Sequence, residues 1–367
     1  MTKSLRITAI ILILVLNLTS PAYSEEEEPW GDFLSAGSYY TLLDPDNEVL
    51  LQTGRRIYPG DEFLSGENKL YKVQTADDKQ QTAQAELLEI VELEVFPWEQ
   101  LQRELELNLA AAEAEEEKGK TRGKIAIYHT HNAESYVPSE GTDSINGKGG
   151  IHRVGAAFAQ ALAALCIDVD YSEKMHLPHD RGAYRRSRET VLELLAKHPD
   201  AIFDVHRDAA PQSAYALQLG NEWITRIQFV VGRQNQNLGI NRKYALSLKK
   251  IADDLYPGLV KGIFFGRGNY NQDLTPLSLL LEVGAHTNSR PAAERGVSLF
   301  SEVVDFYFYG PKAEAAGRDQ GQAARRSITG LLFFVATGLV VFFVINAGGF
   351  LPAWERLKRL ARGLKVK

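Results

Sequence analysis

The chain has little cysteine and little excess positive charge. Cys166 is the only cysteine among 367 residues, so no disulfide can form within the chain. It lies in the apolar run AFAQALAALCIDV, which predicts a buried side chain rather than a catalytic nucleophile. The formal net charge is −6, and a basic excess occurs only at the extreme C-terminus. The sequence thus excludes a disulfide framework and argues against nucleic acid as a partner.

Apolar segments lie near both ends of the chain. Residues 1–24 place basic residues before an apolar run and small residues after it, the layout of a signal peptide or an uncleaved N-terminal anchor. Residues 328–350 lack charge over a length that crosses a bilayer core of about 30 Å, which predicts a transmembrane helix at 327–351. The positive-inside rule then leaves the basic tail at 352–367 in the cytoplasm. We therefore expect a cell-membrane protein with a single pass near the C-terminus and an extracytoplasmic catalytic domain.

Composition changes divide the rest of the chain. Residues 35–96 contain short alternating apolar runs separated by turn sequences such as DPDN and SGEN, which predicts a small β module without a catalytic constellation. Residues 97–123 are rich in Glu, Ala and Leu and predict a helical linker. Residues 311–326 are polar and predict a flexible tether. The part between linker and tether, 124–310, is the expected catalytic domain.

Strand and helix patterns alternate through this catalytic part. The predicted strands are 125–129, 167–171, 201–206, 225–232, 262–266 and 277–284, and the predicted helices are 154–165, 183–198, 236–255 and 291–308. Such alternation predicts an α/β fold, a three-layer domain with a mostly parallel sheet, here preceded by the small β module and followed by the transmembrane helix. Functional sites in such domains lie at the carboxyl ends of the strands.

Several ionisable residues occur at those strand ends. A catalytic zinc ion takes three protein ligands from His and carboxylate side chains and leaves the fourth position open for water. His131, Glu134 and His206 form such a set, with two ligands from one turn and the third from another strand. The spacing also admits His129 in place of His131 and Glu140 in place of Glu134.

Glu282 lies within the apolar run LSLLLEVG. A buried carboxylate is unfavourable unless it has a partner. The partner expected for Glu282 is a metal-bound water or a cation, and a buried arginine is the alternative.

Four segments in this order resemble the stage II sporulation protein P family, a branch of the zinc-dependent N-acetylmuramoyl-L-alanine amidases. The segments are IYHTHNAESYVPSEG, HDRGAYRRSRETV, FDVHRDAA and NYNQDLTPLSLLLEVGAHTNS. The resemblance covers most of 124–310. It implies that Zn2+ is held by His131, Glu134 and His206 and that Glu282 is the catalytic carboxylate.

The resemblance further implies an exported peptidoglycan hydrolase. It would cleave the amide between N-acetylmuramic acid and L-alanine in sporulation-related or other wall remodelling. Other wall-remodelling or sporulation proteins are its expected partners. Arg207 is a candidate for an oxyanion or substrate contact, and an ion pair with Asp204 or Asp208 is its structural alternative. The rival function is a catalytically degenerate peptidoglycan-binding module that recruits partners at the membrane.

Overall fold

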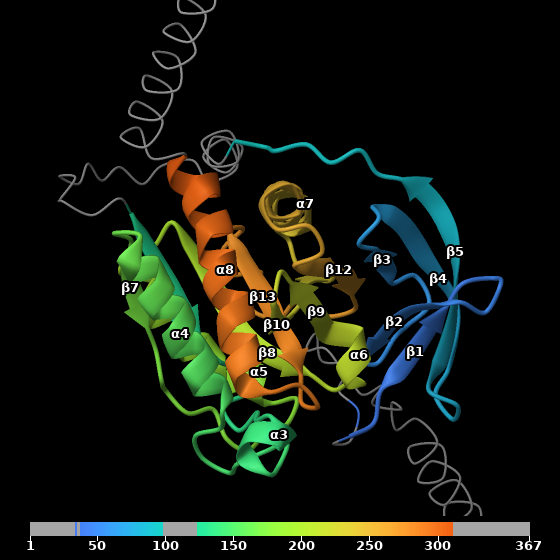
Figure 1. Ribbon diagram of the computed structural model, residues 1–367, viewed down its shortest axis with the longest axis horizontal. Helices are drawn as coiled ribbons and strands as arrows, with labels where there is room; N and C mark the ends of the chain where they lie inside the picture. Colours follow the sequence, from blue (N-terminus) through green and yellow to red (C-terminus); the bar gives the residue numbers. More distant parts are fainter. Residues whose placement is uncertain (1–33, 35–36, 98–122, 311–367) are drawn as a thin grey trace, which may run out of the picture. The chain divides into compact units, whose positions relative to one another are not determined.

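The computed structural model describes residues 34, 37–97 and 123–310 (Figure 1). The described residues as far as Phe308 belong to one compact unit. Several predicted segments lie outside these ranges. They are the signal peptide or anchor, the helical linker beyond residue 97, the tether, the transmembrane helix and the basic tail. Within the described ranges no helix is both long and apolar enough to span a bilayer.

The first described elements are five β-strands. They are β1 (Tyr40–Leu43), β2 (Val49–Thr53), β3 (Glu62–Leu64), β4 (Lys69–Asp77) and β5 (Thr82–Ile90). All but β3 coincide with the alternating runs seen in the sequence. β3 has three residues, which is too short for an alternation to be visible.

The part from residue 124 alternates strands and helices as expected. Its strands are β6 (Lys124–Tyr128), β7 (Asp168–Tyr171), β8 (Ala201–Asp208), β11 (Ile227–Gly232), β12 (Val260–Gly266) and β13 (Ser278–Ala285). Its long helices are α4 (Ile151–Ala164), α5 (Ala183–Leu195), α7 (Leu238–Leu255) and α8 (Arg290–Tyr309). The sequence did not predict the short helices α3 (Val137–Glu140) and α6 (Gln212–Tyr215) or the hairpin of β9 (Ala216–Leu219) and β10 (Glu222–Thr225).

Eleven of the strands form one sheet in the order β2-β1-β5-β4-β3-β12-β11-β13-β8-β6-β7. In the part of the sheet ordered β13-β8-β6-β7, each strand is parallel to the next. The pair of β11 and β13, by contrast, is antiparallel. The α/β class is therefore confirmed, and the sheet is mixed. The reason for the reversal lies between β12 and β13, where the chain has no crossover helix to return it in the parallel sense.

Helices cover both faces of the α/β part of the sheet. On β8, Phe203 contacts Phe158 of α4 and Phe300 of α8, with ring centroids 5.5 Å and 6.0 Å away. The preceding residue, Ile202, instead shares a core cluster with Val191 of α5. Because neighbouring side chains on a strand point to opposite faces, α4 and α8 lie on one face and α5 on the other.

β3 connects the N-terminal strands to the α/β part through its antiparallel pairing with β12. Gly262 of β12 permits this close approach, since a Cβ there would lie 2.4 Å from the carbonyl oxygen of Leu64. Tyr40 and Leu42 also share a core cluster with Tyr184 of α5 and Leu280 of β13. The strands at 40–90 are thus packed against the α/β part, and their core is continuous with it.

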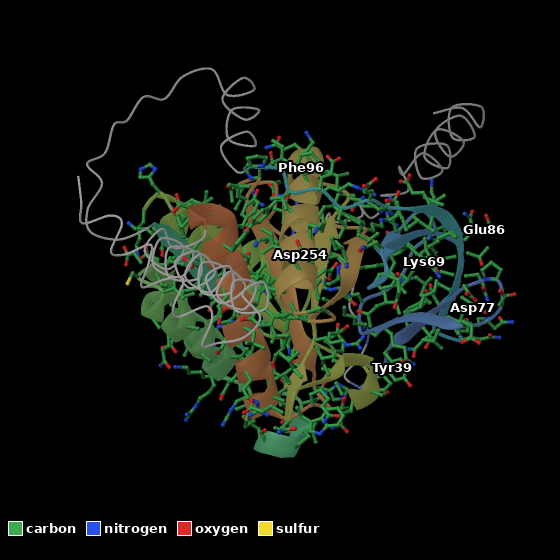
Figure 2. The ribbon with its side chains drawn as sticks, turned by 45° about the horizontal axis from the view of Figure 1, so that its top comes forward. Tyr39, Lys69, Asp77, Glu86, Phe96 and Asp254 are labelled. Carbon is green, nitrogen blue, oxygen red and sulfur yellow. The ribbon has the colours of Figure 1, made fainter. Side chains whose placement is uncertain are left out.

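The chain then crosses to the helices on the other side. Phe96, labelled in Figure 2, donates its backbone N–H to Ser247 Oγ of α7 at 2.9 Å and accepts a hydrogen bond from the Tyr307 hydroxyl of α8 at 3.0 Å. This contact ties the end of the N-terminal strands to both helices.

Cys166 is exposed, so the prediction of a buried side chain is wrong. The residue follows the end of α4 in a left-handed conformation, with φ at 67°. The apolar face of the helix ends before it, and the turn directs its thiol outward.

Candidate active site

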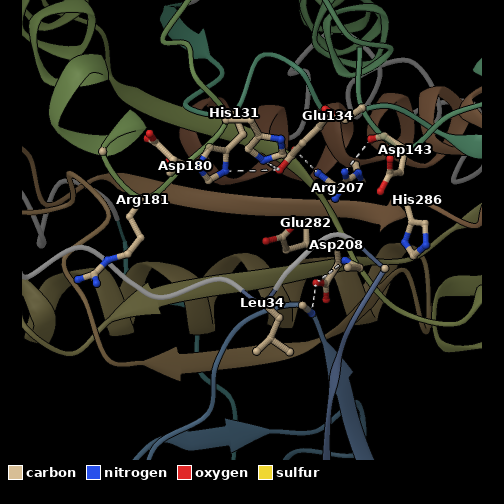
Figure 3. A pocket seen from close by; sticks show the side chains of 16 residues that line it. Leu34, His131, Glu134, Asp143, Asp180, Arg181, Arg207, Asp208, Glu282 and His286 are labelled. Atoms are coloured by element: carbon tan, nitrogen blue, oxygen red, sulfur yellow. Dashed lines mark hydrogen bonds and ion pairs between the residues drawn. The ribbon is translucent and has the colours of Figure 1, made fainter. Parts of the chain in front are cut away.

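His131, Glu134 and His206 come together near the carboxyl ends of β6 and β8. One ligand atom from each lies within 4.8 Å of the other two. Figure 3 labels His131 and Glu134, which lie close together there. Glu134 Oε1 is 3.5 Å from His131 Nδ1 and 3.4 Å from His206 Nδ1. All three side chains are buried. Two imidazoles and one carboxylate match the donor set of a catalytic zinc site.

Asp204 fixes the orientation of His206. Its Oδ1 lies 2.9 Å from His206 Nε2, which leaves Nδ1 facing Glu134. Asp204 is itself held by the backbone N–H of Thr130 at 2.8 Å and by the Thr130 hydroxyl at 2.7 Å. A carboxylate behind a histidine ligand is the usual partner in metal sites. The sequence could have indicated this pairing, because Asp204 and His206 are two residues apart on β8 and therefore lie on the same face.

The charges of the cluster are unequal. Burial lowers the pKa of His131 to about 3, so its imidazole is neutral. Burial also acts to lower the pKa of His206, but Asp204 and Glu134 outweigh it and raise that pKa to about 10. Burial opposes ionisation of Glu134, yet the adjacent histidines hold its pKa well below the usual range. Without a metal, His206 is therefore the positively charged member of the cluster and Glu134 the negatively charged one.

His129 and Glu140 lie outside this cluster. His129 is buried against the other side of the turn, with Nδ1 2.7 Å from the Val205 carbonyl and Nε2 3.0 Å from the Tyr171 hydroxyl. Glu140 pairs with Arg290 at 2.7 Å. The structure therefore brings His131 and Glu134 to His206, while the alternative candidates serve the packing of α3 and α4.

Glu282 lies beside the cluster, on β13, which pairs with the strand of His206. The register pairs Glu282 with His206, so both side chains project from the same face. The Arg55 guanidinium donates to Glu282 Oε1 from Nε at 3.0 Å and from an Nη at 2.5 Å. Burial raises the pKa of Glu282 to about 7 although Arg55 opposes the shift.

Arg55 is a site residue that the sequence reasoning missed. It follows β2, in the module where no catalytic constellation was expected. No local pattern marks it, since its partner lies 227 residues away along the chain. It supplies the buried arginine that was the alternative partner of Glu282.

Arg207 supports the turn that carries Glu134. Its backbone N–H donates to Glu134 Oε2 at 2.9 Å, and its guanidinium donates to the carbonyls of Ser135 at 3.2 Å and Asp143 at 2.8 Å. The expected alternative of an ion pair with Asp204 or Asp208 is wrong for this side chain. Arg207 nevertheless lines the cavity.

The cavity has a volume of about 700 Å³ and opens beside the cluster. Leu34, Asp143, Asp180, Arg181 and His286 line it together with the site residues, as Figure 3 shows. His179, another residue not singled out in the sequence, also lines it, with its Nε2 3.8 Å from Glu134 Oε1. A cavity of this size admits a substrate larger than water or a metal ion.

Comparison with known proteins places these residues in a family context. The sequence pattern of the family described as Stage II sporulation protein P (SpoIIP) matches residues 58–305. The chain is 33% identical over 213 residues to Stage II sporulation protein P of Bacillus subtilis (strain 168), a match that covers 52% of this chain and 53% of that protein. The chain therefore matches about half the length of this relative.

Solved structures with a partial likeness include two amidases. The N-acetylmuramyl-L-alanine amidase Ami1 from Mycobacterium smegmatis is 12% identical, with a TM-score of 0.34 over 52% of this chain and 98% of the other. The CwlD amidase from Clostridioides difficile, solved in complex with the GerS lipoprotein, is 11% identical, with a TM-score of 0.33 over 50% of this chain and 98% of the other. The family match, which spans most of the described structure, decides the assignment: the chain belongs to the stage II sporulation protein P family.

Proposed function

We propose that the protein is a zinc-dependent peptidoglycan amidase that cleaves the bond between N-acetylmuramic acid and L-alanine. The observation that carries the proposal is the cluster of His131, Glu134 and His206, of which His131 and Glu134 line one cavity together with Glu282. Membership of the stage II sporulation protein P family supports wall remodelling during sporulation as the setting.

The donor set fits zinc. His131 is neutral and Glu134 is ionised, so each can offer one atom to the ion. His206, whose Nδ1 faces Glu134, can offer that nitrogen once it has released a proton. Zinc, when bound, supplies a Lewis acid that activates water and polarises a carbonyl group. Two histidine nitrogens and one carboxylate oxygen within reach of one another therefore form a ligand set that suits zinc.

Glu282 is the proposed general base. Its carboxyl group is buried beside the cluster, and its pKa of about 7 suits a group that accepts and returns a proton near neutral pH. It accepts the proton of the attacking water and then delivers it to the departing nitrogen of L-alanine. The scissile amide is thereby split into a carboxylate on the muramic acid side and a free amine on the stem peptide.

The test is digestion of purified peptidoglycan by the full-length protein, with mass analysis of the products. Release of intact stem peptides with a free L-alanine amine is expected. His206→Ala should abolish both zinc retention and cleavage, whereas Glu282→Gln should retain zinc and cleave roughly 100- to 10,000-fold more slowly. Peptidoglycan binding without cleavage by the zinc-loaded wild type would instead support the binding-module function.

We propose further that the protein is held at the cell membrane by residues 327–351, with the active site outside and the tail at 352–367 inside. The charge-free segment and the basic tail support this topology. Protease added to cells with an opened wall should digest the chain before residue 327 and spare a tag placed after Lys367. Digestion of that tag would refute the proposed orientation.

A further inference from the structure

The end of β2 and the residues after it contact two acidic residues of the site, Asp208 and Glu282. Gly54 donates its backbone N–H to Asp208 Oδ1 at 2.7 Å, and the hydroxyl of Thr53 donates to the same oxygen at 3.1 Å. A Cβ at Gly54 would lie 2.7 Å from Ala209 Cβ, so only glycine fits this approach. These contacts set the position from which Arg55 extends to Glu282.

Arg55 is held on several sides. Its guanidinium carbon lies 5.0 Å from the centre of the Tyr270 ring, and one nitrogen is 3.5 Å from the Tyr184 hydroxyl. The side chains of Arg55 and Glu282 are each 2% exposed. A guanidinium so enclosed has little freedom to leave the carboxylate.

The two oxygens of Glu282 differ. Oε1 accepts both hydrogen bonds from Arg55, at 3.0 Å and 2.5 Å. Oε2 is buried and has no hydrogen-bond partner among the residues that the structure describes. One oxygen is therefore anchored by Arg55, whereas the hydrogen-bonding capacity of the other is unused within the described residues.

We propose that Arg55 is a positioning residue that anchors Oε1 of Glu282 so that Oε2 is presented as the reacting oxygen. The N-terminal strands are then part of the active site, because they carry the residue that orients the catalytic carboxylate. This role rests on the proposed amidase function, but the contact itself can be tested without it.

The kinetic test uses the zinc-loaded full-length protein on soluble muropeptides. Arg55→Met should lower kcat by about 100-fold, the loss typical of a reacting group displaced by about 1 Å, while KM stays within about twofold and zinc content is unchanged. Arg55→Lys keeps the charge but not the paired hydrogen bonds, and its kcat should fall between those of Arg55→Met and the wild type. Arg56→Met is the matched control, because Arg56 is the exposed neighbour that pairs with Asp78, and its kcat should equal that of the wild type.

The second measurement is a thermal unfolding cycle. Arg55→Met leaves a buried carboxylate unpaired and should lower Tm by roughly 10 °C, whereas the double variant with Glu282→Gln should regain most of that loss. Additive shifts in Tm would overturn the proposal, and so would a wild-type kcat in Arg55→Met. The proposal would also fail if each variant that loses kcat loses zinc to the same extent. If wild-type protein cleaves no peptidoglycan, the amidase function fails, while a coupled unfolding cycle still supports the anchoring of Glu282 by Arg55.

Discussion

Asp204 Oδ1 lies 2.9 Å from His206 Nε2, on the side of the imidazole opposite Glu134. Both residues belong to β8 and project from the same face of the sheet. This ion pair favours a proton on Nε2 and so leaves the lone pair of Nδ1 to face the cluster. The strand thus supplies a proposed zinc ligand and the group that orients it within three consecutive residues.

The first prediction is that Asp204→Asn weakens zinc binding. The amide is a weaker acceptor and can also donate to Nε2, which moves the remaining proton to the ligand nitrogen. The dissociation constant for zinc should rise about 10- to 100-fold, as for other partners of histidine ligands, and competition with a chelator measures it. Thr130→Val removes one of the two hydrogen bonds to Asp204 and should raise the constant by a smaller factor. Unchanged affinity in Asp204→Asn would show that this carboxylate does not orient the ligand.

The second prediction concerns pH. Zinc binds neutral imidazole, and the pKa of His206 without metal is raised to about 10, so below that pH binding must release the His206 proton. The affinity should therefore keep rising by about tenfold per pH unit from pH 7 to pH 9, where a histidine of ordinary pKa would already be neutral. Calorimetry in buffers of different ionisation enthalpy counts the released protons. In Asp204→Asn the count at pH 8 should fall, because the main cause of the raised pKa is gone, while any other proton release is common to both proteins.

The third prediction separates the ligands from their neighbours in the sequence. His131→Ala and Glu134→Gln should lose zinc, since each removes one of three donor atoms. His129→Ala and Glu140→Gln should retain zinc and lose stability instead, because these side chains hold the Tyr171 hydroxyl and Arg290. Metal analysis of the folded protein, together with Tm, gives both readouts. Zinc loss in His129→Ala alone would reverse the assignment.

Sequence patterns located the sheet strands and the long helices of the α/β part, because those strands are apolar runs of ordinary length. β8 and β13 were predicted almost to their ends, and they carry His206 and Glu282 at their carboxyl ends. The direction of β13 was not accessible in the same way, because the direction of a strand depends on the connection before it and on the strand it pairs with. β3 was missed because three residues show no periodicity.

The choice between His129 and His131 could not be made from spacing. Two residues apart on a strand, both would lie on one face, but β6 ends at Tyr128 and the chain turns at His131. The turn sends one imidazole to the Val205 carbonyl and the other to Glu134. Arg55 was beyond reach for a different reason, since its role exists only after strands far apart in sequence have paired.

The last prediction is that the catalytic part does not function without the N-terminal strands. A fragment of residues 124–310 contains every proposed zinc ligand and Glu282, yet it lacks β3, so β12 would become an open edge of the sheet. An exposed edge strand invites pairing between molecules. The fragment would also leave Phe264 without the cluster it shares with Tyr40, and Glu282 without Arg55.

We therefore expect the 124–310 fragment to self-associate, to melt at a lower temperature than a fragment of residues 37–310, and to cleave peptidoglycan at least about 100-fold more slowly even when zinc is supplied. Size-exclusion chromatography, thermal unfolding and digestion of peptidoglycan measure the three effects. The longer fragment is the control, since it restores β3 and Arg55 but not the residues before 37 or after 310. A monomeric 124–310 fragment with the activity of the longer one would show that residues 40–90 are needed neither for folding of the catalytic part nor for its activity. A fragment that is soluble, holds zinc and still cleaves slowly would locate the defect at Glu282, where the loss of Arg55 acts directly.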